Sequence, residues 1–123
     1  MWRFQQSTGK LWRITPSVRQ LVATGYAGAG PGVNNPDMQH VPQVGPCPQG
    51  RYIIGPPEEG HGGYTLRLRP LPGTVMFGRS GFLIHGDDFD PAPNSASKGC
   101  LIFPRAIREA IWRSGDRVLE VIR

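Results

Sequence analysis

Glycine and proline punctuate this sequence so densely that few segments can form a long helix. There are 17 glycines and 13 prolines among 123 residues, and they separate short apolar runs. Because glycine weakens regular structure and proline lacks a backbone donor, the runs between them suit short strands joined by turns. The length fits one domain with one core. We therefore expect a loop-rich, mostly β single domain over residues 1–123.

Apolar runs bounded by turn residues mark the expected strands. A hairpin turn at Ser7-Thr8-Gly9 joins the first two strands and predicts an antiparallel meander. In the strand that begins at Tyr64, apolar and polar residues alternate, so one face should be buried and the face with Thr65, Arg67 and Arg69 exposed. The expected strands lie at residues 2–6, 10–14, 19–24, 51–54, 64–69, 82–84, 100–103 and 117–122.

Only the segment after Pro104 has the pattern of a helix. Proline suits a first helical turn, Glu109 and Arg113 are spaced to form an ion pair, and Gly115 can end the helix. The pattern predicts an apolar face made of Ala106, Ile107, Ala110 and Ile111. The mostly β fold should therefore carry one short helix near its C-terminus.

Residues 25–50 are dominated by Gly, Pro and Asn. Such a composition predicts a long, ordered surface loop, because these residues favour turns. Long loops in compact domains often serve function. We expect this loop to shape or cover a functional cleft.

The net charge of +5 comes from basic residues scattered along the whole chain. It favours an anionic partner only weakly, and without a basic helix or arginines interleaved with aromatic residues it does not indicate nucleic-acid binding. The first residues lack the apolar run of a signal peptide, and no segment approaches the ~20 apolar residues of a membrane span. We expect a monomer made in the cytoplasm without a signal peptide.

A histidine and a cysteine stand at the ends of two expected strands. His85 follows Phe82-Leu83-Ile84, and Cys100 opens the strand 100–103. A free thiol has a pKa of ~8.5, so it needs a neighbouring imidazole to become the thiolate that attacks a carbonyl. We expect Cys100 to be the nucleophile and His85 its base.

The residues beside this pair fit the same chemistry. A glycine before the nucleophile leaves room for substrate, and the amides of Gly99 and Cys100 are candidate donors to an oxyanion. The second nitrogen of His85 needs a partner. Asp87, Ser95, Ser97 or a backbone carbonyl can supply it, and the sequence does not choose among them.

The remaining cysteine, histidines and aspartates have several readings. Cys47 lies in a rigid turn as a semi-buried thiol, or it forms a disulfide with Cys100 that would block the nucleophile. His40 and His61 are expected as loop residues, with His61 at the border of the cleft. A zinc site of His61, His85 and Cys100 lacks any close ligand pair. Asp87, Asp88 and Asp90 lack the spacing of a calcium loop and are expected to form an acidic rim. No metal and no cofactor is expected.

Two motifs resemble the active-site signature of the L,D-transpeptidase (YkuD-like) catalytic domain. They are Ile84-His85-Gly86 and, downstream, Ser97-Lys98-Gly99-Cys100. Further segments resemble the branch of that family delivered as type VI secretion effectors: Gln6-Ser7-Thr8-Gly9, Gly32-Val33-Asn34-Asn35-Pro36, the stretches 44–52 and 76–82, and Ser114-Gly115-Asp116. The resemblance spans nearly the whole chain, and it implies an L,D-transpeptidase-like β-sandwich or barrel.

The resemblance implies an enzyme that acts on peptidoglycan stem peptides. Cys100 would attack the carbonyl of the third residue of a tetrapeptide stem, expel the terminal D-alanine and leave a thioester. Water, a free D-amino acid or a second stem would resolve the thioester. An antibacterial effector of this kind would act in the periplasm of a target bacterium, with a secretion apparatus and an immunity protein as partners.

The chain departs from the family pattern next to the nucleophile. Lys98 stands where many transpeptidases have a second histidine, and residues 101–103 lack the Arg or Asn that often follows the cysteine. In place of these family residues, Arg79 and Arg105 are expected to bind substrate carboxylates, unless they form structural salt bridges. The expected substrate-binding residues are Ser97, Arg79, Gly86, Asp87 and Arg105. The rival interpretation is a non-catalytic peptidoglycan-binding module on the same fold.

Overall fold

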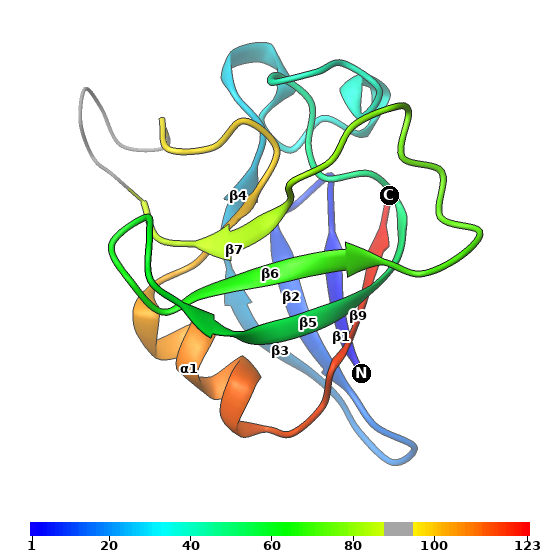
Figure 1. Ribbon diagram of the computed structural model, residues 1–123. Coiled ribbons are helices and arrows are strands. Elements are labelled where there is room, and N and C mark those ends of the chain that lie inside the picture. Colours follow the sequence, from blue (N-terminus) through cyan, green and yellow to red (C-terminus); the bar gives the residue numbers. More distant parts are fainter. Residues whose placement is uncertain (88–94) are drawn as a thin grey trace.

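The protein, described here by a computed structural model for residues 1–87 and 95–123, is built around one strongly curved sheet (Figure 1). Nine strands follow one another in the order β3-β2-β1-β9-β5-β6-β7-β8-β4. The strands are β1 (Trp2–Gln5), β2 (Lys10–Ile14), β3 (Arg19–Thr24), β4 (Tyr26–Ala27), β5 (Gly50–Glu58), β6 (Thr65–Pro70), β7 (Leu83–His85), β8 (Leu101–Ile102) and β9 (Val118–Ile122). The sheet is nearly closed and barrel-like, which confirms the mostly β prediction.

The first three strands form the expected antiparallel meander. β1 pairs with β2 and β2 with β3, both antiparallel. Gly9, at a φ of +74°, completes the first turn. β9 returns along the other side of β1 in a parallel pair. The last strand therefore joins the meander to the second half of the sheet, where β5, β6 and β7 follow as antiparallel neighbours.

The core lies inside the curved sheet and under its one helix. Phe4 and Phe103 meet edge to face, with ring centroids 5.9 Å apart. Fully buried side chains come from nearly every strand, because alternate residues point inward. The largest are Tyr52, Phe4, Phe103, Leu11, Ile54, Leu66, Ile84, Leu101, Ile111 and Leu119.

Within the described residues the only α-helix is α1 (Arg105–Arg113), which contacts β5 and β7. As predicted, Glu109 pairs with Arg113, and it pairs more closely with Arg105. The predicted apolar face is wrong in part. Ala106 and Ala110 are exposed, and Arg108 is buried beside Ile111. The helix buries a guanidinium because that group can reach backbone carbonyls, as described below.

The long segment 25–50 is an ordered loop, but it contains more structure than expected. β4 and two short 3-10 helices, η1 (Gly30–Gly32) and η2 (Pro36–Met38), interrupt it. The predicted strand at 51–54 extends to Glu58. Thr65, predicted to face solvent, is buried, since its hydroxyl donates to the carbonyl of Gly60.

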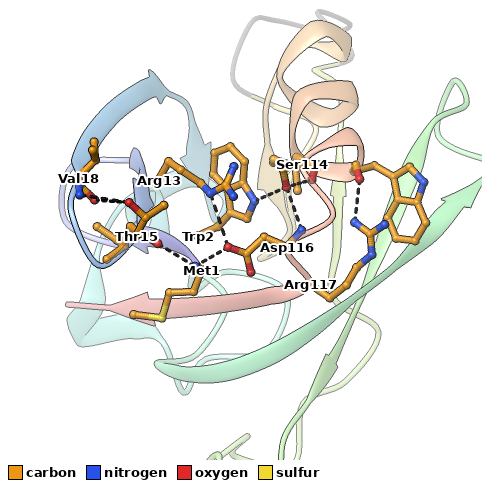
Figure 2. A network of polar contacts seen from close by, with 11 residues as sticks. Met1, Trp2, Arg13, Thr15, Val18, Ser114, Asp116 and Arg117 are labelled. Atoms are coloured by element: carbon orange, nitrogen blue, oxygen red, sulfur yellow. Dashed lines mark hydrogen bonds and ion pairs between the residues drawn. The ribbon is translucent and has the colours of Figure 1, made fainter.

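Among the described residues no helix has the length and apolar character needed to cross a membrane. The chain start lies at one end of the sheet, and the loop from residue 28 to 49 gathers at the other (Figure 1). Figure 2 shows the first of these ends, where Asp116 pairs with the Met1 amine and with Arg13. There Ser114 accepts a hydrogen bond from the Trp2 indole.

Candidate active site

Neighbouring strands β7 and β8 place His85 and Cys100 on one face of the sheet. The two strands are parallel, with Ile84 opposite Leu101 and His85 opposite Ile102. Continuing this register by one residue sets Cys100 beside Leu83, two positions along from His85. Side chains two positions apart on a strand point to the same side. The two residues predicted from sequence to act together therefore share one face, opposite to the core residues Ile84 and Leu101.

Both side chains line one cavity of about 440 Å³, which we call the thiol cavity. The loop 25–50 contributes Pro42 and Gln43 to its wall. The loop therefore helps to form this cavity, as expected, while the functional role of the cavity stays a prediction. The remaining wall comes from His61, residues 78–83, Ala96 and Lys98.

His85 is buried, and its ring is oriented by the next residue. Nδ1 lies 2.9 Å from the carbonyl oxygen of Gly86. Because a carbonyl only accepts, Nδ1 carries the proton and Nε2 is left as the basic nitrogen. Among the partners left open by the sequence, the structure shows a backbone carbonyl. Burial lowers the pKa of His85 and the Gly86 carbonyl opposes it, while His61 and Arg108 lower the pKa further.

The Cys100 thiol is partly exposed to the cavity. Burial raises its pKa, and hydrogen bonds from the backbone amides of Leu83 and Cys100, with the charge of Arg79, oppose that rise. The raised pKa of the thiol and the lowered pKa of the imidazole both favour the neutral forms at neutral pH. In a neutral thiol–imidazole pair, attack on a carbonyl requires proton transfer from the thiol to the imidazole.

The amide of Gly99 is engaged inside its own loop. It donates to Ser97 Oγ over 3.0 Å, which differs from its predicted role as an oxyanion donor. The amides at the thiol are those of Leu83 and Cys100. Glycine is needed at position 99 for another reason. Its φ is +130°, and a Cβ there would come within 2.6 Å of Arg79 and 2.8 Å of Phe82.

Ser97 fixes the loop before the nucleophile. Its hydroxyl accepts from the amides of Gly28 and Gly99 and donates to the carbonyl of Cys100 over 2.7 Å. The side chain is 1% exposed. All of its bonding capacity is used within the protein, which is typical of a residue that positions a loop. Its predicted contact with substrate stays a prediction.

Arg79 also bonds to backbone. Its guanidinium donates to the carbonyls of Gln39, Gly45, Pro46 and Lys98. These bonds tie the loop 25–50 to the segment that carries Cys100. The structural salt bridge considered from the sequence is not seen, because Arg79 has no carboxylate partner among the described residues. Four of its five N–H donors bond to these carbonyls, and its binding of a substrate carboxylate stays a prediction. Burial lowers its pKa.

The other predicted substrate-binding residues line a second cavity, of about 560 Å³, which we call the Arg108 cavity. Gly86 and Asp87 lie in its wall, with Arg105 and Arg108 from α1. Asp87 accepts from the Tyr26 hydroxyl over 2.8 Å. Arg105 bonds to Glu109 and lies over the ring of Tyr64, away from the thiol cavity. The structure thus does not bring Arg105 to Cys100.

The ring of His61 packs against the ring of His85, the candidate base. The rings of His61 and His85 are stacked, with centroids 4.6 Å apart and planes at 25°. The prediction that His61 borders the cleft is confirmed, whereas its contact with His85 was not foreseen. The turn of residues 60–63 brings it there, with His61 itself at a φ of +48°. Nothing in the spacing of the two histidines, 24 positions apart in sequence, signals this contact.

The two cysteines differ sharply. Both are free, so the disulfide considered from the sequence is not formed. Cys47 is fully buried, more so than expected, and burial raises its pKa to about 12.

Among the described residues no group of three or more His, Cys, Asp or Glu side chains is placed to hold a metal ion. The acidic rim expected at Asp88 and Asp90 lies outside the described residues.

Comparison with known proteins identifies a family. A family model described as the Tlde1 domain matches residues 22–121, a span that includes both cavities and most of the chain. No curated protein and no solved structure matches.

Proposed function

The chain belongs to the Tlde1 domain family, a family of type VI secretion effectors, and we propose that this member acts as a cysteine enzyme on peptidoglycan stem peptides. The sequence-based expectation of a type VI secretion effector is confirmed at the level of the family. The proposed activity is that of an L,D-transpeptidase or L,D-carboxypeptidase. Its proposed place of action is the periplasm of a target bacterium, and an effector of this family is consistent with an immunity protein and a secretion apparatus as partners.

The observation that carries the proposal is the placement of His85 and Cys100. They lie on one face of neighbouring strands and in one cavity, and the Gly86 carbonyl fixes the imidazole so that Nε2 is free to take a proton. A nucleophile, a base and a group that orients the base are the parts that covalent acyl transfer needs. The cavity offers space for a peptide beside them.

In the first half of the reaction Sγ of Cys100 attacks the carbonyl carbon of the third stem residue. The thiol proton passes to His85 Nε2 as the S–C bond forms. The amides of Leu83 and Cys100, which lie at the thiol, are the proposed donors to the oxyanion. When the intermediate collapses, the C–N bond breaks and His85 returns the proton to the departing amine of D-alanine. An acyl thioester remains on Cys100.

In the second half an acceptor resolves the thioester. Water or an amine attacks the acyl carbon and gives a proton to His85, and the C–S bond breaks. The thiolate that leaves then recovers the proton from His85. With water the product is a tripeptide stem, with a free D-amino acid an exchanged stem, and with a second stem a cross-link.

The direct test is mass spectrometry of purified tetrapeptide-stem muropeptides after incubation with the protein, with and without D-methionine. We expect loss of the alanine mass, or its replacement by methionine, with the unaltered protein. Cys100→Ala should give neither product, and Cys47→Ala is the matched control that should keep both.

An unchanged spectrum from folded protein whose Cys100 thiol is demonstrably free would contradict the proposal. If that protein still bound peptidoglycan sacculi, and Cys100→Ala bound them equally, the non-catalytic binding module would be the better account.

A further inference from the structure

Arg108 is a buried cation that forms no ion pair among the described residues. Its side chain is 6% exposed, and none of the ion pairs in the described part of the chain includes it. Nε donates to the Phe103 carbonyl, and Nη1 donates to the carbonyls of Gly63 and Tyr64. A guanidinium in this setting is costly unless something compensates its charge. Burial lowers its pKa and the neighbouring charge of Arg105 lowers it further, while the charge of Glu109 opposes this fall.

The second terminal nitrogen of Arg108 is the one left for a ligand. Nη2 makes no hydrogen bond within the described residues, and it lies against Gly86, where a Cβ would come within 3.1 Å of it. Both residues line the Arg108 cavity. Because Gly86 has no side chain, Nη2 is accessible at the residue that directly follows His85. The cavity wall nearby is apolar, with Val33, Ile102 and Phe103.

His85 lines the thiol cavity, and the next residue, Gly86, lines the Arg108 cavity. A smaller hollow between them shares His61, His85 and Ala96 with the thiol cavity and Gly86 and Asp87 with the Arg108 cavity. Tyr26 pairs with Ile102 on β8, so it extends the same sheet face beyond His85. Within the described residues, a ligand in the Arg108 cavity can therefore extend through the smaller hollow to His85 and the thiol cavity.

We propose that the Arg108 cavity is the acceptor site, where Arg108 binds the carboxylate of the amine that resolves the thioester. The inference rests on the proposed function, since only an acyl enzyme has an acceptor. A free D-amino acid and a second stem whose third residue ends in an amine and a carboxylate on one carbon share this chemistry. The guanidinium holds the carboxylate, and the adjacent amine then lies beside His85 and faces the acyl carbon.

The step balances with groups already present. The amine nitrogen attacks the thioester carbon, a C–N bond forms and the C–S bond breaks. One N–H proton passes to His85 Nε2 and then to the Cys100 thiolate. Water needs no carboxylate, so hydrolysis should depend on Arg108 much less than exchange does.

The test compares acceptors that differ only in the carboxylate. With the unaltered protein, D-methionine should give exchange with a KM at least about tenfold lower than D-methioninamide, because the amide loses a charge-assisted hydrogen bond. In Arg108→Gln that preference should disappear, while hydrolysis of the tetrapeptide falls by less than the exchange rate. A parallel assay with tripeptide stems as acceptors, read as dimer formation, tells whether a second stem uses the same site.

Arg117→Gln is the matched control, since Arg117 also bonds to a backbone carbonyl and packs on Trp112. It should keep the preference for D-methionine over the amide. Equal KM values for the two acceptors in the unaltered protein would overturn the proposal without any variant.

A binding measurement separates this inference from the proposed chemistry. In Cys100→Ala, which cannot form the acyl enzyme, D-methionine should shift the backbone amide signals of Gly86 and Asp87 in a nitrogen-proton NMR spectrum, and D-methioninamide should not. If neither compound shifts them, the acceptor site is wrong even when the parent protein releases alanine. If the carboxylate binds but no alanine is released, the proposed function fails and the site remains.

Discussion

At the thiol end of the sheet, the buried side chains of Arg79 and Ser97 bond to backbone, whereas at the end that carries Met1 the carboxylate of Asp116 forms ion pairs (Figure 2). Arg79 and Ser97 together make seven bonds to carbonyls and amides of loop segments. Asp116 instead pairs with the Met1 amine and Arg13. Bonds to backbone fix the path of loops, and bonds between surface side chains add only stability. The first kind should therefore control turnover, and the second should not.

The largest expected effect is at His85. His85→Gln should lower tetrapeptide turnover by about 10²–10⁴-fold, because it removes the general base while leaving the fold intact. In the parent protein kcat/KM should rise as pH increases through the lowered pKa of His85, below the ordinary value of 6.5, and then level off. In the variant that step should vanish. A variant with full activity and the same pH step would show that His85 is not the base.

Arg79 sharpens the comparison, because it serves both geometry and stability. Arg79→Gln should cost about 2–4 kcal/mol of unfolding free energy, since buried carbonyls lose charged donors. Turnover measured under conditions where the variant is fully folded should also fall, because the loop 25–50 and the Lys98 carbonyl lose their hydrogen bonds to Arg79. Arg79→Lys should not restore it, because one ammonium cannot reach four carbonyls. Denaturant titration and steady-state kinetics measure the two effects. Unchanged turnover in the folded variant would break the comparison.

Asp116 should show the opposite pattern. Asp116→Asn should lose about 1 kcal/mol or less, the usual worth of partly exposed ion pairs, with turnover unchanged. Burial tends to raise the pKa of Asp116, but bonding to the Met1 amine and the charge of Arg13 lower it overall. A lowered pKa means that this stability is present above the ordinary Asp value of 3.8 and is lost as pH falls through the folded-state pKa.

Thermal unfolding of both proteins across acidic pH measures this. At the lowest pH values the parent should no longer be more stable than Asp116→Asn. A drop in turnover of the variant at neutral pH would contradict the distinction between the thiol end and the Met1 end of the sheet.

The sequence predicted the strands well where residues alternate or form short apolar runs, and the helix where spacing and Gly115 marked its end. It failed where a polar side chain serves distant backbone. Arg108 is buried on α1 in place of the expected alanines, since its partners, Phe103, Gly63 and Tyr64, include carbonyls more than 40 positions away. Local patterns carry no trace of such bonds.

The candidate pair His85 and Cys100 could be found because the chemistry needs those residue types next to glycine at strand ends. The roles of their neighbours could not. Ser97 and Arg79 have the chemistry of substrate ligands, and only the folded chain shows that most of their hydrogen-bonding groups are bonded to backbone. His61 reaches His85 through a glycine-rich turn whose path the sequence does not define.

The central claim is that Cys100 carries the acyl group, and the most direct measurement is peptide mapping after rapid acid quench of protein mixed with tetrapeptide stem. The account predicts the stem, less its terminal alanine, on the peptide that contains Cys100, with the Cys47 peptide unmodified and no adduct in Cys100→Ala. Alanine release by Cys100→Ala, or an acyl group found on any other residue, would contradict it.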